Sequence, residues 1–132
     1  GDKYHLINEV ASGGELSRIL LSMKTLLSVE RTIPTMIFDE IDSGVSGKVA
    51  NEIGIILKHL SSTSQVLCIT HLPQVAAMGK SHFHVSKEID ESRTYTKIKL
   101  LNKEERLFEI ASMLGGEKPG RAAIDNAAEL LN

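Results

Sequence analysis

The chain has 132 residues, of which 42% are hydrophobic and 24% charged, the ordinary composition of one folded domain. A formal charge of −2 and a 4% aromatic content argue against a basic nucleic-acid-binding chain and a base-stacking platform. The single cysteine, Cys68, excludes an internal disulfide and fits a reducing compartment. No apolar run is long enough to span a membrane, so we expect no membrane partner.

The opening segment predicts a capped helix. Residues 4–9 read as a short extended segment, and Ser12-Gly13-Gly14 then interrupts the chain. Ser12 suits an N-cap, and Glu15 suits the first helical turn. An apolar stripe follows at helical spacing, and we expect it to pack in the core. The stripe consists of Leu16, Ile19, Leu20, Met23, Leu26 and Leu27.

Two apolar runs, residues 35–38 and 65–70, predict buried parallel strands. Between them, a loop marked by Gly44 and Gly47 leads to a helix expected from about residue 49 to residue 60. Strand, helix and strand form a right-handed crossover unit, whose strands end at the same edge of the sheet.

The rest of the chain predicts two strands, at residues 82–88 and 93–101, and then two helices. We expect the strands to extend the core sheet as an antiparallel hairpin. One helix covers residues 104–114, and Pro119 opens another that ends near Leu131. The predicted fold class is therefore α/β, with a mostly parallel core sheet, an added hairpin and two C-terminal helices.

Three motifs are candidates for chemistry. At Ser12-Gly13-Gly14, the N–H groups of a helix start favour an anion such as phosphate, although the same residues also suit a plain helix entry. An acid pair, Asp39 and Glu40, ends the first strand, where one carboxylate can hold a metal and the other can activate water, or where both simply form a surface turn.

The third motif is His71, which follows the second strand. Its imidazole could contact a phosphate, order a water molecule or be structural. A glycine-rich helix start, an apolar strand ending in Asp-Glu and a later strand ending in His resemble, in this order, the signature motif, Walker B motif and switch histidine of the ABC-type ATPases. The fold that this resemblance implies is the C-terminal lobe of a P-loop NTPase-like head.

The residues after the acid pair narrow the resemblance. Transporter ATPases usually have Pro-Thr there, whereas Ile41-Asp42 looks like the SMC and DNA-repair branch. Within that branch, four segments are similar to the RecN DNA-repair family. They are VASGGELSR (10–18), IFDEIDSGVSG (37–47), THLPQVA (70–76) and MLGG (113–116). Ser46 stands where the wider SMC branch usually has the D-loop aspartate, so that aspartate's role is not carried over.

The resemblance implies a role for each motif residue. Asp39 would support Mg²⁺, through water, Glu40 would polarise the attacking water, and His71 would sense the γ-phosphate. The signature residues would clasp the γ-phosphate of ATP held by a second head, so the helix start is expected to sit apart from the acid pair of its own chain. These residues are Ser12, Gly13, Gly14 and Glu15.

A Walker A phosphate loop is absent from the sequence, because neither Gly47-Lys48 nor Gly79-Lys80-Ser81 has the required pattern. We therefore expect residues 1–132 to be the C-terminal lobe of a head in a RecN-like double-strand-break repair protein. The resemblance implies three partners: the protein's own N-terminal Walker A half, a second head in a homodimer, and DNA bound through the full-length protein. It also implies a bacterial cytoplasmic, nucleoid-associated location, and no ATP hydrolysis by the isolated chain.

Other interpretations stay open. The chain could belong to a head of another SMC or ABC-type ATPase, or be a nucleotide-independent dimerisation or docking module. A small hydrolase using Glu40 and His71 lacks a nucleophile motif. His82 and His84 have metal-like spacing but no third ligand nearby in the sequence, and Cys68 is expected to be a core residue. The basic residues around Lys97 to Arg106 are expected to form a solvated face.

Overall fold

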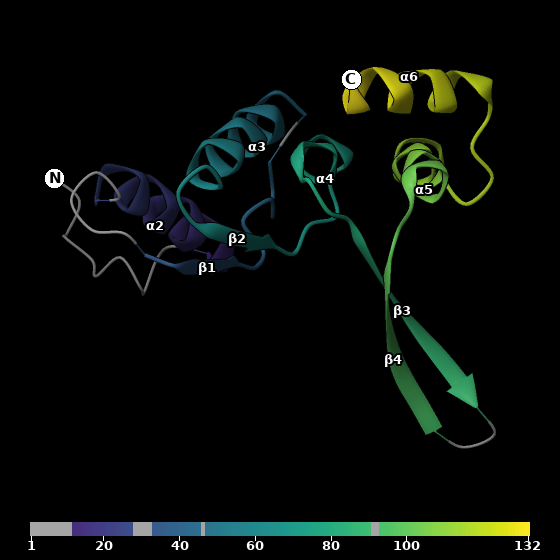
Figure 1. Cartoon of the computed structure of the whole chain (residues 1–132), viewed down its shortest axis with the longest axis horizontal. Coiled ribbons are helices and arrows are strands. Elements are labelled where there is room, and N and C mark those ends of the chain that lie inside the picture. Colours follow the sequence, from purple (N-terminus) through teal and green to yellow (C-terminus); the bar gives the residue numbers. More distant parts are fainter. Residues whose placement is uncertain (1–11, 28–32, 46, 91–92) are drawn as a thin grey trace, which may run out of the picture. The chain divides into compact units, whose positions relative to one another are not determined.

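The structure of the chain is a computed structural model that describes residues 12–27, 33–45, 47–90 and 93–132. The expected extended segment at residues 4–9 and the D-loop position Ser46 lie outside the described residues. In chain order (Figure 1), the elements are α2 (Gly13–Leu27), β1 (Thr35–Phe38), α3 (Gly47–Leu60), β2 (Gln65–Cys68), α4 (Pro73–Met78), β3 (Phe83–Asp90), β4 (Arg93–Leu100), α5 (Lys103–Gly115) and α6 (Arg121–Leu131).

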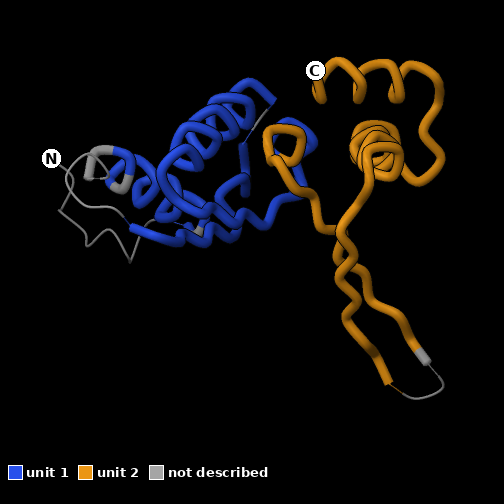
Figure 2. The backbone as a smooth tube through the Cα atoms, viewed as in Figure 1, with its two compact units in different colours: residues 1–75 blue, residues 76–132 orange. Residues whose placement is uncertain are grey.

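The chain divides into two compact units, residues 1–75 and residues 76–132 (Figure 2). In the first, β1 and β2 pair in parallel from Thr35↔Gln65 to Phe38↔Cys68. The predicted strand–helix–strand order is thus confirmed, although α3 begins two residues earlier than expected. Strand β2 ends two residues earlier than predicted, at Cys68, which pairs with the last β1 residue, Phe38. Ile69 N still donates to the Phe38 carbonyl (2.9 Å).

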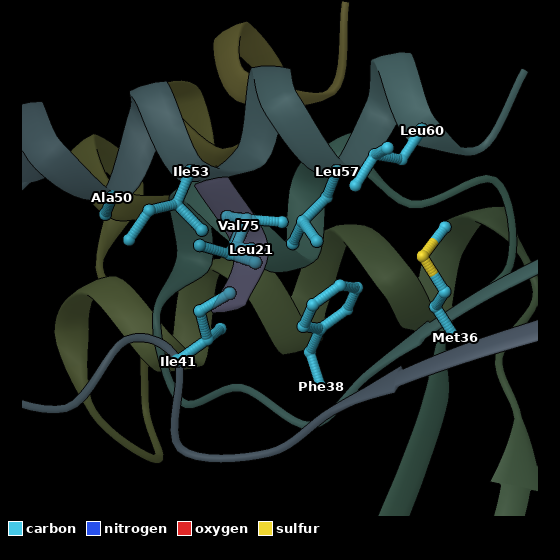
Figure 3. Packing of buried hydrophobic residues seen from close by; sticks show 9 residues of the cluster. All are labelled: Leu21, Met36, Phe38, Ile41, Ala50, Ile53, Leu57, Leu60 and Val75. Atoms are coloured by element: carbon cyan, nitrogen blue, oxygen red, sulfur yellow. The ribbon is translucent and has the colours of Figure 1, made fainter. Parts of the chain in front are cut away.

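The core of the first unit lies on one face of this sheet. Met36 and Phe38 point from β1 toward α3, whose Ile53 and Leu57 belong to the same buried cluster (Figure 3). The other buried members of the cluster are Leu21, Ile41, Ala50, Leu60 and Val75. On the opposite face, Ile37 and Leu67 are 66% and 45% exposed. Among the described residues, the predicted strands are therefore covered on one face, and the other face is exposed.

Helix α2 turns a different face to the core from the one predicted. Leu21 is buried, whereas Ile19, Leu20 and Met23 of the expected core stripe are exposed. The buried residue Gly14 lies seven positions before Leu21, which is two helical turns, so both lie on the same side of the helix. The contact of Gly14 with the turn after β1 therefore orients α2 against its own hydrophobic periodicity.

The second unit contains a hairpin that forms a two-stranded sheet of its own. Strands β3 and β4 pair antiparallel from Phe83↔Leu100 to Asp90↔Arg93. The predicted hairpin is confirmed, but among the described residues its strands pair only with each other and do not extend the sheet of β1 and β2. Residues 91–92 of the expected turn lie outside the described residues.

Two C-terminal helices complete the second unit. Asn102 caps α5 in a capping box with Glu105, whose backbone N–H donates to Asn102 Oδ1 (2.9 Å). Helices α5 and α6 pack through the buried residues Ile110, Ala111 and Ala127. Helix α6 begins at Arg121, two residues after Pro119, with Gly120 at the N-cap. None of the described helices has the length and apolarity needed to cross a membrane.

The packing on α3 provides a matched test of the core. Ile53 is 4% exposed and Ile55 is 46% exposed on the same helix. We expect Ile53→Ala to lower the free energy of unfolding by about 2–5 kcal/mol, because the truncation leaves a cavity. Ile55→Ala, measured by urea denaturation followed by circular dichroism, should change it by less than about 1 kcal/mol. Equal losses in both variants would contradict the described orientation of α3.

Candidate functional site

The start of α2 is held by a reciprocal cap, as the sequence predicted. Glu15 N donates to Ser12 Oγ (3.3 Å), and Ser12 N donates to Glu15 Oε2 (2.8 Å). The hydrogen bond from the Ser12 backbone, followed by that from its side chain, lowers the pKa of Glu15. The other N–H groups of a first helical turn have no acceptor within the helix and can meet an anion. Ser12 and Glu15 are exposed at this end of α2, whereas Gly14 is buried.

The next residues of α2 pack against the turn that follows β1. A Cβ added at Gly14 would lie 2.9 Å from Ser43 Cβ and 3.0 Å from the Glu40 carbonyl oxygen. Arg18 Nη1 donates to the Ser43 carbonyl (2.8 Å), and Ser17 Oγ donates to the Asp39 carbonyl (3.3 Å). The expectation that the helix start sits apart from the acid pair of its own chain is therefore wrong at the level of the backbone.

The acid pair lies on this turn. Asp39 and Glu40 are both exposed, directly after the buried Phe38. Glu40 has a left-handed backbone (φ 55°), and Ser43 N donates to its carbonyl (3.1 Å). A left-handed conformation costs a non-glycine residue roughly 1–2 kcal/mol, so it persists where surrounding contacts impose it, often at functional sites. The contacts of α2 with the Asp39 and Glu40 carbonyls supply that constraint.

The turn also carries Asp42, a buried carboxylate to which the sequence analysis assigned no role. Its side chain is 2% exposed, and its Oδ2 accepts hydrogen bonds from Thr70 Oγ1 and from His71 N (3.0 Å). His71 Nδ1 lies 3.2 Å from the same oxygen, although the imidazole is 71% exposed. Leu72 N donates to Thr70 Oγ1 (3.0 Å), which closes the turn after β2.

Opposing influences act on the Asp42 carboxyl. Burial alone raises its pKa, but the hydrogen bonds from Thr70 and from the His71 backbone outweigh burial, and the pKa lies below its usual value. Asp42 is therefore ionised at neutral pH. Burial, with the nearby carboxylates of Asp42 and Asp39, raises the pKa of the Cys68 thiol to about 12. Cys68 packs partly buried against the core, as expected, and stays protonated at neutral pH.

The structure thus brings the candidate residues to one corner of the first unit. Asp39 and Glu40 follow β1, His71 follows β2, and the Phe38↔Cys68 register sets the two strand ends side by side. The start of α2 packs on the same turn. Sequence reasoning did not predict the contacts of Arg18, Asp42 and Thr70, because polar residues in a turn or helix carry no local signal of which distant group they contact.

This corner offers few metal ligands. Among the described residues, no group of three or more His, Cys, Asp and Glu side chains could hold a metal ion. Mg²⁺ commonly binds one or two carboxylates and takes its other ligands from water and phosphate. The exposed carboxylate of Asp39 fits that mode, whereas a cradle for the β- and γ-phosphates of a nucleotide is not found in this sequence.

The two histidines of metal-like spacing, His82 and His84, differ in their surroundings. His84 Nε2 lies 3.8 Å from Glu109 Oε1, and no third ligand joins His82 and His84 in the described chain. Burial, and then the charge of Arg106, lowers the pKa of His82. Arg106 donates to the carbonyls of Ala77 (2.8 Å) and Gly79 (2.5 Å) at the end of α4.

The lysines of the hairpin are paired. Lys97 Nζ lies 2.9 Å from Glu88 Oε1, and Lys99 Nζ lies 2.5 Å from Glu105 Oε1. Together with the hydrogen bonds of Arg106 to backbone carbonyls, these pairs account for much of the basic run. Lys97 and Lys99 remain more than half exposed, as a solvated face requires.

No family model matches this chain. DNA repair protein RecN from Bacillus subtilis is 45% identical over 131 residues, which is 99% of this chain and 23% of that protein. RecN from Haemophilus influenzae is 46% identical over 132 residues, 100% of this chain and 24% of that protein. RecN from Deinococcus radiodurans is 42% identical over 131 residues, with 99% and 23% coverage.

The chain therefore spans about a quarter of the length of these curated relatives. A solved structure from work on the ATP-driven dimerization and DNA-stimulated activation of SMC ATPases has a TM-score of 0.61. The match covers 89% of this chain and 70% of that chain, at 21% identity. The fold of this chain is thus that of part of an SMC ATPase head, as the sequence predicted.

Gly14 gives a test of the contact between α2 and the turn. We expect Gly14→Ala to lower the free energy of unfolding by about 1–3 kcal/mol, because the new methyl group meets Ser43 and the Glu40 carbonyl. Gly47→Ala is the control, since its Cβ would meet only Gln74 at an ordinary 3.6 Å. Urea denaturation measures both. A neutral Gly14→Ala variant would contradict this close approach.

Asp42 gives a test in pH. We expect Asp42→Asn to lower the free energy of unfolding at pH 7 by about 1–3 kcal/mol, because hydrogen bonds to a charged acceptor are lost. The folded pKa of Asp42 is depressed, so its stabilisation is complete above its unfolded pKa of about 3.9 and is lost as pH falls through the folded pKa.

The difference between wild type and variant should therefore shrink as the solution is acidified below the unfolded pKa. Urea denaturation at a series of pH values measures it. Glu15 and Glu105 also have lowered pKa values, but both proteins share them, so their effect cancels. A constant difference down to the lowest pH would contradict the ionised, hydrogen-bonded state of Asp42.

Proposed function

Because this chain is related by sequence to the RecN family over its whole length, we propose that it is the C-terminal part of an ATP-binding and ATP-hydrolysing head of a bacterial DNA double-strand-break repair protein. One observation carries the proposal. The start of α2, the acid pair after β1 and the histidine after β2 all connect to the single turn at residues 39–44.

Each motif has a role in this proposal. Asp39 supports Mg²⁺ through water, and ATP with Mg²⁺ supplies the phosphoryl group that is transferred to water. Glu40 polarises the attacking water, and the exposed imidazole of His71 contacts the γ-phosphate. The exposed, capped start of α2 offers N–H groups to the γ-phosphate of a nucleotide. Its residues are Ser12, Gly13, Gly14 and Glu15.

The proposed ATP site lacks a Walker A phosphate loop in this sequence, so we propose two partners that complete it. The first is a Walker A half from the N-terminal part of the same protein. The outward face of β1 and β2 supports it, because Ile37, Leu67 and Ile69 are exposed there. The second is another head, whose nucleotide meets the start of α2. The likeness to a structure from work on ATP-driven dimerization supports a homodimer of heads.

We extend the proposal to the whole protein. Residues 1–132 form the C-terminal lobe of the head, and DNA is engaged through other parts of the full-length protein. The curated relatives are DNA repair proteins of bacteria, which supports a cytoplasmic, nucleoid-associated location. The chain by itself has a net charge of −2 and hydrolyses no ATP, since the Walker A lysine and loop are supplied elsewhere.

The test is to mix this chain with a separately produced polypeptide that supplies the Walker A half. We expect ATP-dependent association, measured by analytical ultracentrifugation, that Ser12→Arg abolishes, because a long side chain covers the anion-binding helix start. Ser12→Thr is the matched control, since threonine keeps the capping hydroxyl. Equal association with and without ATP would favour a nucleotide-independent docking module.

The same mixture tests the acid pair. We expect Glu40→Gln to keep ATP-dependent association and to lower turnover by about 100- to 10,000-fold, the usual range for loss of a general base. Turnover by the isolated chain that Glu40→Gln abolishes would contradict the proposal, because it would mean that the nucleotide site is complete within residues 1–132.

A further inference from the structure

Among the described residues, Asp42 is the one charged side chain that is buried. All of its contacts with the turn after β2 are made by the same carboxylate oxygen, Oδ2. Thr70 Oγ1 and His71 N donate to Oδ2, and His71 Nδ1 lies 3.2 Å from it. Thr70 in turn accepts from Leu72 N. The backbone of His71 is therefore held on both sides, while its imidazole remains largely exposed.

The charge of Asp42 decides which imidazole nitrogen carries a proton. A neutral imidazole has one N–H and one lone pair, and the group beside one nitrogen sets the state of the other. A lone pair on Nδ1 would face an ionised oxygen at 3.2 Å, whereas an N–H there is attracted to it. The buried, ionised carboxylate therefore favours the proton on Nδ1 and leaves Nε2 directed away from it.

We propose that Asp42 is the positioning residue for His71, which holds the imidazole with its proton on Nδ1 so that Nε2 meets the ligand. The proposal rests on the function proposed above, in which His71 acts at the γ-phosphate. In neutral His71, Nε2 is then an acceptor for the attacking water. When His71 is protonated, Nε2–H donates to phosphate, and Asp42 balances the charge. Triads in which an aspartate orients a histidine use the same physical principle.

Among the described residues, few charged groups lie near Asp42 and His71. Asp39 and Glu40 lie on the same turn as Asp42, and both are exposed. Cys68 on β2 stays protonated and does not compete for the imidazole proton. Arg18 from α2 uses its Nη1 on the carbonyls of Ile41 and Ser43. Among these groups, Asp42 is the one that contacts His71.

The experiment is NMR of this chain labelled with ¹⁵N-histidine, without nucleotide, at a pH about two units above the ordinary histidine pKa of 6.5. The ¹⁵N shifts of His71, assigned with His71→Gln, report which ring nitrogen carries the proton. We expect the Nδ1–H form to predominate in the wild type. Asp42→Asn should reduce its ratio to the Nε2–H form by about fivefold or more, because a neutral acceptor binds an N–H less strongly.

Asp39→Asn is the matched control, because it removes the charge of a nearby exposed carboxylate that, unlike Asp42, forms no ion pair with His71 in the described part of the chain. This variant should leave the ratio unchanged. Predominance of the Nε2–H form in the wild type would overturn the proposal, and this measurement needs no variant to fold. An unchanged ratio in folded Asp42→Asn would also overturn it, since Asp42 would then only brace the backbone of the turn.

A second measurement uses ATP turnover by the complete head, which is this chain combined with the Walker A half. Asp42→Asn and His71→Gln should each lower kcat, and the double variant should lose no more than His71→Gln alone, because Asp42 acts through His71. Additive losses would overturn the proposal. The failure of the proposed function is distinguishable: it would appear as absent ATP-dependent association of the wild type, whereas the imidazole state is read without nucleotide.

Discussion

A buried carboxylate on the turn after β1 ties the two strand ends of the first unit together. Asp42 is desolvated, so it requires hydrogen-bond donors, and the turn after β2 supplies them through Thr70 and His71. An exposed histidine thereby acquires a defined orientation from a buried neighbour. The hydrogen bonds from Thr70 and from the His71 backbone hold Asp42 ionised despite its burial, because together they stabilise the charged form more than desolvation disfavours it.

The turn has a second neighbour in α2. The absence of a side chain at Gly14 lets the helix approach Ser43 and the Glu40 carbonyl, and Arg18 completes the contact from the next helical turn. A helix start that can bind an anion is therefore coupled mechanically to the carboxylates after β1. Movement of either element must be accommodated by the other, since both share the backbone of residues 39–43.

Apolar surface remains on the outer face of β1 and β2 and on the exposed side of α2, where Ile37, Leu67 and Met23 are accessible. Scattered exposed apolar residues are ordinary, but a sheet face and a helix stripe together favour further burial in a longer polypeptide. The curated relatives are about four times the length of this chain. The core that the chain does form lies on the other face of the sheet, where Met36 and Phe38 are almost fully buried.

The sequence by itself determined the elements of this chain, because apolar periodicity, caps and turns act locally. It located the strand at residues 35–38 and the cap at Ser12, and its motifs indicated the RecN family. Tertiary structure decided which faces are buried, since the fit of Gly14 against the turn overrode the apolar stripe of α2. Packing also gave Asp42 its partners: Thr70 and His71 lie 28 and 29 residues further along the chain, and local patterns carry no information on such a contact.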